Sequence, residues 1–268
     1  MGYSTDSSQL MNYFIWDFDP VLANFDHVRI HWYGAMFALA LLSNYLFMHW
    51  VYLRELGNAE DVDRLLWYCM GGSVLGARLG HVLFYNPSYY LAEPVKIFAI
   101  WEGGLASHGG VFGVLISLYI YQRKAPFDYL WILDRAAVAA SLSGCLVRIG
   151  NFLNSEIAGI ATDVPWAVIF KRLDDIPRHP VQLYEAISYA GIFLFLLYLY
   201  KQNRTFIFNG QLFSWFLILI FSSRFLLEFY KVNLVDYATD FWFSTGQMLS
   251  VPFVILGIFL LYRAQKYT

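Results

Sequence analysis

The sequence predicts an all-α polytopic membrane protein, a bundle of seven transmembrane helices that forms a single membrane-embedded domain over residues 1–268. Two observations lead to this fold class. Hydrophobic residues make up 59% of the chain and charged residues only 14%, whereas about a quarter of a soluble domain is charged. The mean hydropathy is +0.48, and apolar residues recur in runs of about 20, the length that crosses a bilayer as a helix. No basic tract suggests a nucleic-acid partner.

The apolar runs define the expected helices in chain order. The first 27 residues contain four aspartates but no lysine or arginine. The basic segment of a cleavable signal peptide is therefore missing, and we expect the first run to be kept as a helix. The third run is short unless it includes residues that precede it. The expected spans are 30–53, 65–85, 109–122, 130–150, 182–200, 210–230 and 246–262.

Lysines and arginines in the connections predict which side faces the cytoplasm, because short cytoplasmic loops carry an excess of them. Eight lie in the first, third and fifth connections and the C-terminal tail, against five in the longer loops of the other side. We therefore expect the N-terminus and residues 160–176 outside, and the C-terminus in the cytoplasm. The five outer cations are Lys96, Lys171, Arg172, Arg178 and Lys231.

Five further arginines lie within spans or at their ends: Arg29, Arg78, Arg135, Arg148 and Arg224. An ionisable side chain in hydrocarbon costs roughly 2.5 to 3.5 kcal/mol, so each needs a partner, water or a charged ligand. Ion pairing between helices is the simple interpretation, and we apply it to Arg78 and Arg135. Arg148 and Arg224 stand near the outer ends of their spans, where a lipid head group would be met, so we expect them to bind an anion. Glu228 follows Arg224 by four residues, on the same helix face.

The densest group of polar residues follows Arg148. Within twelve residues at the end of an apolar run, a cation, two amides, a hydroxyl and a carboxylate occur together. Groups of this kind are expensive to place in hydrocarbon unless they are paired, hydrated or bound to a ligand. We interpret the segment as the floor of a polar cavity. Its polar members are Arg148, Asn151, Asn154, Ser155 and Glu156, and Gly159 ends it.

Two glycine-rich segments lie before the polar segment in the sequence. Gly76 and Gly80 indicate close helix packing. The run 101–110 surrounds His108, and irregular backbone at membrane depth survives only where protein covers it or a cavity hydrates it. His108 is therefore a candidate functional residue, with a purely structural role as the alternative.

Three more polar residues fall on the outer side of this topology. His31 and Tyr33 begin the first span, and Glu185 lies just inside the fifth, where it needs a partner. Because these residues share one side of the membrane, we treat them as parts of one site. Cys69 and Cys145 lie inside apolar runs, as small buried hydrophobes do, and no metal-ligand spacing is present.

Taken together, the motifs resemble the prolipoprotein diacylglyceryl transferase family of the bacterial inner membrane. The resemblance covers essentially the whole chain. The motifs are His31-Trp-Tyr33-Gly, Gly76-Ala-Arg78-Leu-Gly80, Ser107-His108-Gly-Gly, Arg148-Ile-Gly-Asn151-Phe-Leu-Asn154-Ser-Glu156 with Gly159, Arg178-His179-Pro180 with Gln182-Leu-Tyr184-Glu185, Arg224 with Glu228, and Gly246-Gln247-Met-Leu-Ser250. The resemblance implies transfer of the diacylglyceryl group of phosphatidylglycerol to the thiol of a lipobox cysteine in a prolipoprotein, with glycerol phosphate released.

The resemblance also implies roles for the candidate residues. Arg148 and Arg224 would stabilise charge on the departing phosphate, and His108 would accept the thiol proton. Asn151, Asn154 and Glu156 would bind the glycerol hydroxyls, and Tyr33 and His31 the phosphate or the acyl-glycerol junction. We expect no cofactor and no metal, because the thiol arrives with the second substrate. The remaining residues expected to bind substrate are Gly159, Arg78, Glu185 and Glu228.

Two positions depart from the family pattern. Ile220 stands where a tyrosine is expected, four residues before Arg224, and Ser155 stands where a glycine is expected before Glu156. The segment 160–176 is also short for the family, so no contacts are expected of it.

Two other classes of function use similar residues. A secondary transporter or channel for an anion would line its pathway with the same arginines, but no inverted repeat is evident. An intramembrane serine protease would need a nucleophile such as Ser141 or Ser143, and neither lies in a Gly-x-Ser-Gly context.

Overall fold

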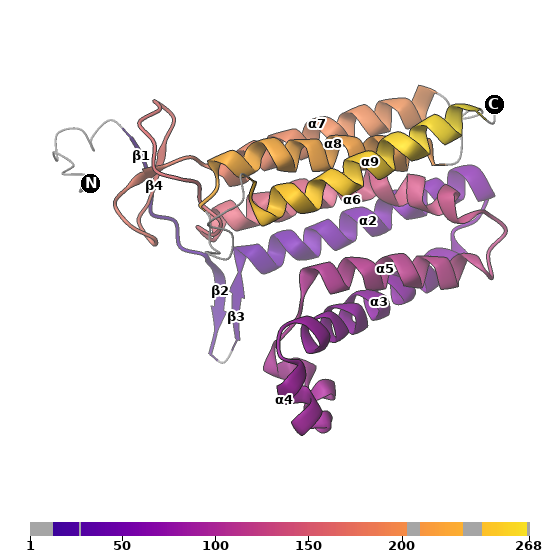
Figure 1. The fold of residues 1–268 in the computed structure, drawn as a ribbon, viewed down its shortest axis with the longest axis horizontal. Coiled ribbons are helices and arrows are strands. Elements are labelled where there is room, and N and C mark those ends of the chain that lie inside the picture. The colour runs from indigo at the N-terminus through magenta and orange to yellow at the C-terminus, as the bar shows by residue number, and fades with distance from the viewer. Residues whose placement is uncertain (1–12, 27, 203–209, 233–242, 267–268) are drawn as a thin grey trace. The chain divides into compact units, whose positions relative to one another are not determined.

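The computed structural model describes residues 13–26, 28–202, 210–232 and 243–266 (Figure 1). A helix lies over each predicted apolar run. The long helices are α2 (Trp32–Leu56), α3 (Glu60–Phe84), α5 (Ser107–Gln122), α6 (Tyr129–Leu153), α7 (Val181–Gln202), α8 (Gln211–Leu227) and α9 (Thr245–Lys266). Short helices α4 (Pro87–Ala92), η1 (Pro94–Phe98) and η2 (Ile100–Glu102) link α3 to α5, and η3 (Glu228–Tyr230) follows α8.

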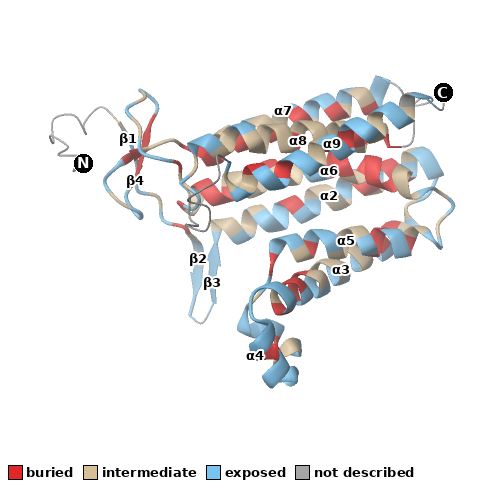
Figure 2. Ribbon diagram, in the orientation of Figure 1, coloured by how far each residue is buried: buried red, intermediate tan, exposed pale blue. Residues whose placement is uncertain are grey.

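Among the described helices, five are long and apolar enough to cross a membrane. They are α2, α6, α7, α9 and the segment Gln211–Tyr230. Much of the length of these helices is exposed in the protein alone (Figure 2). Large apolar side chains such as Leu194 and Phe259 are among the exposed residues, as a lipid-facing surface requires. The protein is therefore a mainly helical, multi-pass membrane protein. The other two long helices, α3 and α5, are not among these five. The helix α5 has only 16 residues, about 24 Å at 1.5 Å per residue, and α3 begins with three acidic residues.

The fold is mainly helical, as expected, but short strands also occur on both sides of α2 in the sequence. The strand β1 (Phe14–Trp16) pairs in parallel with β4 (Val168–Phe170), which pairs antiparallel with β5 (Pro177–Arg178). The strands β2 (Val21–Phe25) and β3 (Val28–His31) form a hairpin. Three-residue strands are too short to show an alternating pattern, and β1 pairs with a segment far along the chain. Phe152, Val168 and Phe170 form a small core beside this sheet.

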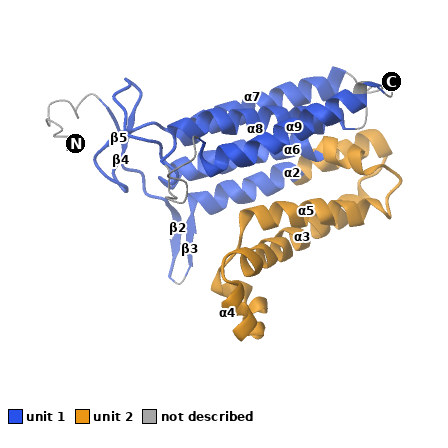
Figure 3. Cartoon of the chain, in the orientation of Figure 1, with its two compact units in different colours: residues 1–44, 136–268 blue, residues 45–135 orange. Residues whose placement is uncertain are grey.

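The chain divides into two compact units, which we describe separately (Figure 3). Unit 1 comprises residues 1–44 and 136–268, and unit 2 comprises residues 45–135. The single-domain organisation stays a prediction. In unit 1, α8 packs against both α7 and α9, and Ser143 of α6 donates a hydrogen bond of 3.1 Å to the Ala40 carbonyl of α2.

Unit 2 is built on a close contact between α3 and α5. A Cβ atom added at Gly76 would lie 2.3 Å from the Gly109 carbonyl oxygen, and one at Gly72 would lie 2.6 Å from that of Gly113. The packing interpretation of Gly76 and Gly80 is therefore confirmed. The structure also confirms ion pairing for Arg135, whose Nη2 lies 2.8 Å from the Glu55 carboxylate of α2.

Candidate active site

The end of α6 and the turn after it bring four of the predicted residues together. The backbone reverses through Ser155 and Ile157, which have φ angles of 56° and 57°, a region that non-glycine residues seldom adopt. The reversal returns Glu156 to α6. Its side chain accepts hydrogen bonds from Nδ2 of Asn151, at 3.2 Å, and from Nδ2 of Asn154. The Arg148 Nη1 lies 3.4 Å from Oδ1 of Asn151.

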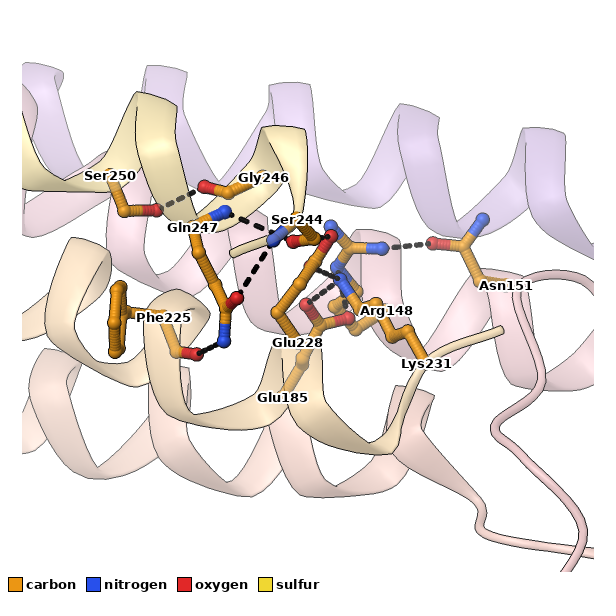
Figure 4. Close-up of polar contacts among 10 residues, drawn as sticks. All are labelled: Arg148, Asn151, Glu185, Phe225, Glu228, Lys231, Ser244, Gly246, Gln247 and Ser250. Carbon is orange, nitrogen blue, oxygen red and sulfur yellow. Dashed lines mark hydrogen bonds and ion pairs between the residues drawn. The ribbon is translucent and has the colours of Figure 1, made fainter. Parts of the chain in front are cut away.

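Glu185 of α7 lies at the centre of the charged part of the site (Figure 4). Its side chain is fully buried. Oε2 lies 3.0 Å from Arg148 Nε, and Oε1 lies 2.8 Å from the Lys231 ammonium. The contact to Arg148 meets the distance of an ion pair, but the N–H does not point along the line of a hydrogen bond. We therefore treat it as an ion pair held by charge, which leaves the other guanidinium nitrogens largely unused.

Glu228 extends this ion-pair cluster to α9. Oε2 of Glu228 lies 3.3 Å from the Lys231 ammonium, and Oε1 accepts a hydrogen bond of 3.3 Å from Ser244. A Cβ atom at Gly246 would lie only 2.3 Å from Glu228 Oε1, so a side chain at position 246 would force the carboxylate to shift. Ser244 and Gln247 hydrogen-bond each other at the start of α9.

Arg224, in the last turn of α8, makes no ion pair with Glu228 among the described residues, although the two lie on one helix face; anion binding by Arg224 stays a prediction. Lys231 and Ser244 take the oxygens of Glu228 instead. Arg224 interacts with Tyr189 of α7, whose hydroxyl also lies in the field of Glu185 and Arg148. Ile220 is buried and offers no hydroxyl to Arg224.

Gly150 allows Tyr33 to lie close to this part of α6. A Cβ atom at Gly150 would lie 3.2 Å from the Tyr33 ring. The Tyr33 hydroxyl makes no hydrogen bond to another described residue. His31 is exposed and pairs with Val21 in the hairpin, so the structure brings Tyr33, but not the His31 ring, into contact with the site.

The segment before α7 is held by a second ion pair. The Arg178 Nη2 lies 2.5 Å from Asp174, and its Nη1 donates to the Gly159 carbonyl at 3.2 Å. The hydrogen bonds from Arg178 lower the pKa of Asp174, and burial lowers the pKa of His179. A Cβ atom at Gly159 would lie 2.6 Å from the Tyr230 carbonyl oxygen. The geometry therefore gives Gly159 a backbone-packing role.

Arg78 and His108 belong to unit 2. Arg78 is 4% exposed and makes no ion pair among the described residues, so the ion-pair interpretation was wrong for it. It donates instead to the carbonyl oxygens of Lys96, Ile97, Ala99, Gly103 and Gly104. His108 is exposed in the first turn of α5. The run around it is helical from Ser107 onward, so only its first part has irregular backbone.

The sequence interpretation missed Lys231 as a site residue and counted it as a loop cation. Its spacing of three residues from Glu228, at the end of a predicted span, is a signal that pairs cations with carboxylates on one helix face. Within the described ranges, no group of histidine, cysteine, aspartate and glutamate is arranged to hold a metal ion.

Buried arginine, lysine and carboxylate side chains with amides at one end of the helices define a membrane-embedded protein with a polar functional site. Comparison with known proteins narrows this class. The family model described as prolipoprotein diacylglyceryl transferase matches residues 20–263. The chain belongs to the prolipoprotein diacylglyceryl transferase family, and it is therefore an enzyme, a transferase.

Curated relatives agree along nearly the full chain. A phosphatidylglycerol–prolipoprotein diacylglyceryl transferase of Tolumonas auensis is 47% identical over 252 residues, which cover 94% of this chain and 97% of the relative. The protein of the same name from Chloroherpeton thalassium is 46% identical, with 95% and 96% covered. That from Bacteroides fragilis is 41% identical, with 92% and 94% covered.

Proposed function

We propose that this enzyme transfers the diacylglyceryl group of phosphatidylglycerol to the thiol of the lipobox cysteine of a prolipoprotein, the first step of bacterial lipoprotein maturation. The match of the family model over residues 20–263 carries this proposal. The names of the relatives above supply both substrates. The thiolate sulfur forms a bond to C3 of the diacylglycerol moiety, the bond from C3 to the phosphate oxygen breaks, and glycerol phosphate leaves.

The leaving phosphate needs a donor with fixed geometry, and a guanidinium provides two parallel N–H groups for it. Arg148 suits this role because its Nε faces Glu185 while Nη1 makes only a long contact of 3.4 Å to Asn151. No described group accepts a hydrogen bond from its Nη2. Arg224, which interacts with Tyr189, is the second candidate for phosphate binding.

The amides of Asn151 and Asn154, with Glu156, are proposed to bind the glycerol hydroxyls. Glu156 is exposed and oriented by both amides, so its orientation is fixed before a substrate binds. Tyr33 is proposed to hold the phosphate or the acyl-glycerol junction, whereas the same role for the exposed His31 ring stays a prediction without a contact that supports it. Glu185 and Glu228 would act on the substrate through the cations that they hold.

The acceptor thiol must lose its proton, since a thiol has a reference pKa of about 8.5 that apolar surroundings raise. We assign this step to His108, the candidate base of unit 2. The nucleophile comes with the peptide, so the enzyme needs neither a cysteine of its own nor a cofactor.

We also propose seven spans, with the N-terminus outside and the C-terminus in the cytoplasm, in the bacterial cytoplasmic (inner) membrane, and with the site toward the periplasmic face. The excess of basic residues in the short connections supports this orientation. Reporter fusions after Arg204 and near Asp175 should report opposite sides. Reporters on one side would refute the orientation.

The decisive test uses purified protein in detergent with phosphatidylglycerol and a lipobox peptide. We expect release of glycerol phosphate only when the peptide carries its cysteine, and a peptide with serine at that position is the matched control. Phosphatidylglycerol left intact with both peptides would refute the proposal and favour a transporter for an anion.

A further inference from the structure

The side chain of Lys231 is largely buried, although the residue lies just after the end of a helix. Its side chain is 12% exposed, and its ammonium lies 2.8 Å from Glu185 Oε1 and 3.3 Å from Glu228 Oε2. A buried cation carries a large desolvation cost that only well-placed partners offset. Two carboxylates, from α7 and η3, provide that compensation.

The consequence of this contact falls on Arg148. Each oxygen of Glu185 faces a different cation: Oε1 faces Lys231 and Oε2 faces Arg148 Nε. A carboxylate with both oxygens free takes a guanidinium through two parallel hydrogen bonds. Because Lys231 occupies Oε1, no Nη group of Arg148 hydrogen-bonds Glu185, and the Nη groups stay available.

We propose that Lys231 is a positioning residue, which holds one oxygen of Glu185 and thereby keeps the Nη edge of Arg148 free for the substrate's phosphate. The proposal rests on the proposed function. Arg148, Lys231, Glu185 and Glu228 together carry no net charge, since two cations face two carboxylates. Without Lys231 the same cluster carries one negative charge, which would repel a phosphodiester.

The structure fixes Lys231 through its backbone as well. The backbones of Lys231 and Gly159 form an isolated antiparallel β-bridge, and the Ile160 N–H donates to the Tyr230 carbonyl at 2.9 Å. Ser244 holds Glu228 on the other side. The turn after α6 and the start of α9 therefore both help to place one ammonium group, which also gives Gly159 and Gly246 a role through Lys231.

The test compares Lys231→Gln, which removes the charge, with Lys231→Arg, which keeps it. We expect Lys231→Gln to lower kcat/KM for phosphatidylglycerol about 10- to 100-fold, because the Nη edge of Arg148 both binds the phosphate and stabilises its charge as it leaves. Lys231→Arg should stay within a few-fold of the unaltered protein. Lys171→Gln is the matched control, since Lys171 is a half-exposed lysine paired with Asp175, and it should change nothing.

A double-variant cycle shows whether Lys231 acts through Glu185. In a Glu185→Gln background no carboxylate at 185 can capture Arg148, so adding Lys231→Gln should change kcat/KM little. If Lys231→Gln alone fails to fold, the double variant is compared with Glu185→Gln. A large difference between these two would contradict the inference. Thermal unfolding in detergent is measured for every variant.

Three results would overturn the inference: an unchanged kcat/KM in Lys231→Gln, an equal loss in Lys231→Arg, or an effect of equal size with and without Glu185. If the unaltered protein fails to consume phosphatidylglycerol with the cysteine peptide, the proposed function fails instead.

Discussion

Arg78 and Arg148 both lie on helices among polar groups, yet they use their donors in opposite ways. Arg78 is almost fully buried, and its three nitrogens donate to five backbone carbonyl oxygens, which equals the number of N–H groups that a guanidinium carries. Arg148 has one ion pair to Glu185 and one long contact to Asn151. A saturated arginine holds the protein's own chain, and an unsaturated one can hold a ligand.

The same substitution at two positions tests this comparison most strongly. We expect Arg148→Lys, and Arg224→Lys, to lower the transfer rate about 10²- to 10³-fold, nearly as far as alanine, because a lysine keeps the charge but loses the paired donors. The rate with a lipobox peptide is the measurement, and Arg263→Lys on the exposed end of α9 is the control. Near-normal rates in both lysine variants would mean that these arginines supply only a diffuse positive field.

His108→Ala tests whether unit 2, which contains Arg78, supplies a catalytic residue. We expect about a 10²-fold lower rate at neutral pH, the size of a general-base contribution, with partial recovery as the pH approaches the thiol's own pKa near 8.5. A rate that stays uniformly low at every pH would assign His108 a structural role. Full activity of His108→Gln at neutral pH would exclude the base role, since an amide cannot take the proton.

Arg78→Lys should act on stability more than on chemistry. Lysine has three donors in place of five, so at least two buried carbonyl groups lose a partner, at about 1 to 3 kcal/mol each. We expect a loss of about 2 to 6 kcal/mol in the free energy of unfolding, measured by denaturation in detergent. A variant of unchanged stability that has lost transfer activity would instead make Arg78 a substrate-binding residue.

Ser155→Gly probes the turn that places Glu156, and its expected effect is the smallest. The φ angle of 56° at Ser155 costs a side chain about 1 kcal/mol, and its buried Oγ has no partner among the described residues. We expect the glycine variant to gain up to about 1 kcal/mol of stability with little change in rate. Ser155→Ala keeps the backbone cost, so a rate lost equally in both variants would show that the hydroxyl contacts substrate.

Local patterns in the sequence predicted much of this structure. The run 130–150 corresponds to α6, Tyr129–Leu153, because hydropathy along a helix is a local property. The polar segment after Arg148 was predicted as a cluster for the same reason. The positive φ at Ser155 explains why the family pattern has glycine at this position.

Contacts between distant segments were beyond prediction. Nothing near Glu185 in the sequence points to Lys231, and nothing near Arg78 points to the carbonyls of the α3–α5 connection. The helix-face spacing of Arg224 and Glu228 suggested a pair, but Lys231 and Ser244 offered Glu228 nearer partners. Such choices depend on tertiary geometry, which a single sequence does not contain.

The parallel pairing of β1 with β4 joins Phe14 to Val168. During synthesis the first strand emerges long before its partner exists, and it can acquire hydrogen bonds only after residues through Phe170 have been made and have reached the same side of the membrane. Contacts of such large sequence separation form late. The N-terminal strand is therefore expected to be ordered among the last parts of the chain, and a nascent protein that stops before β4 would leave β1 without its partner strand.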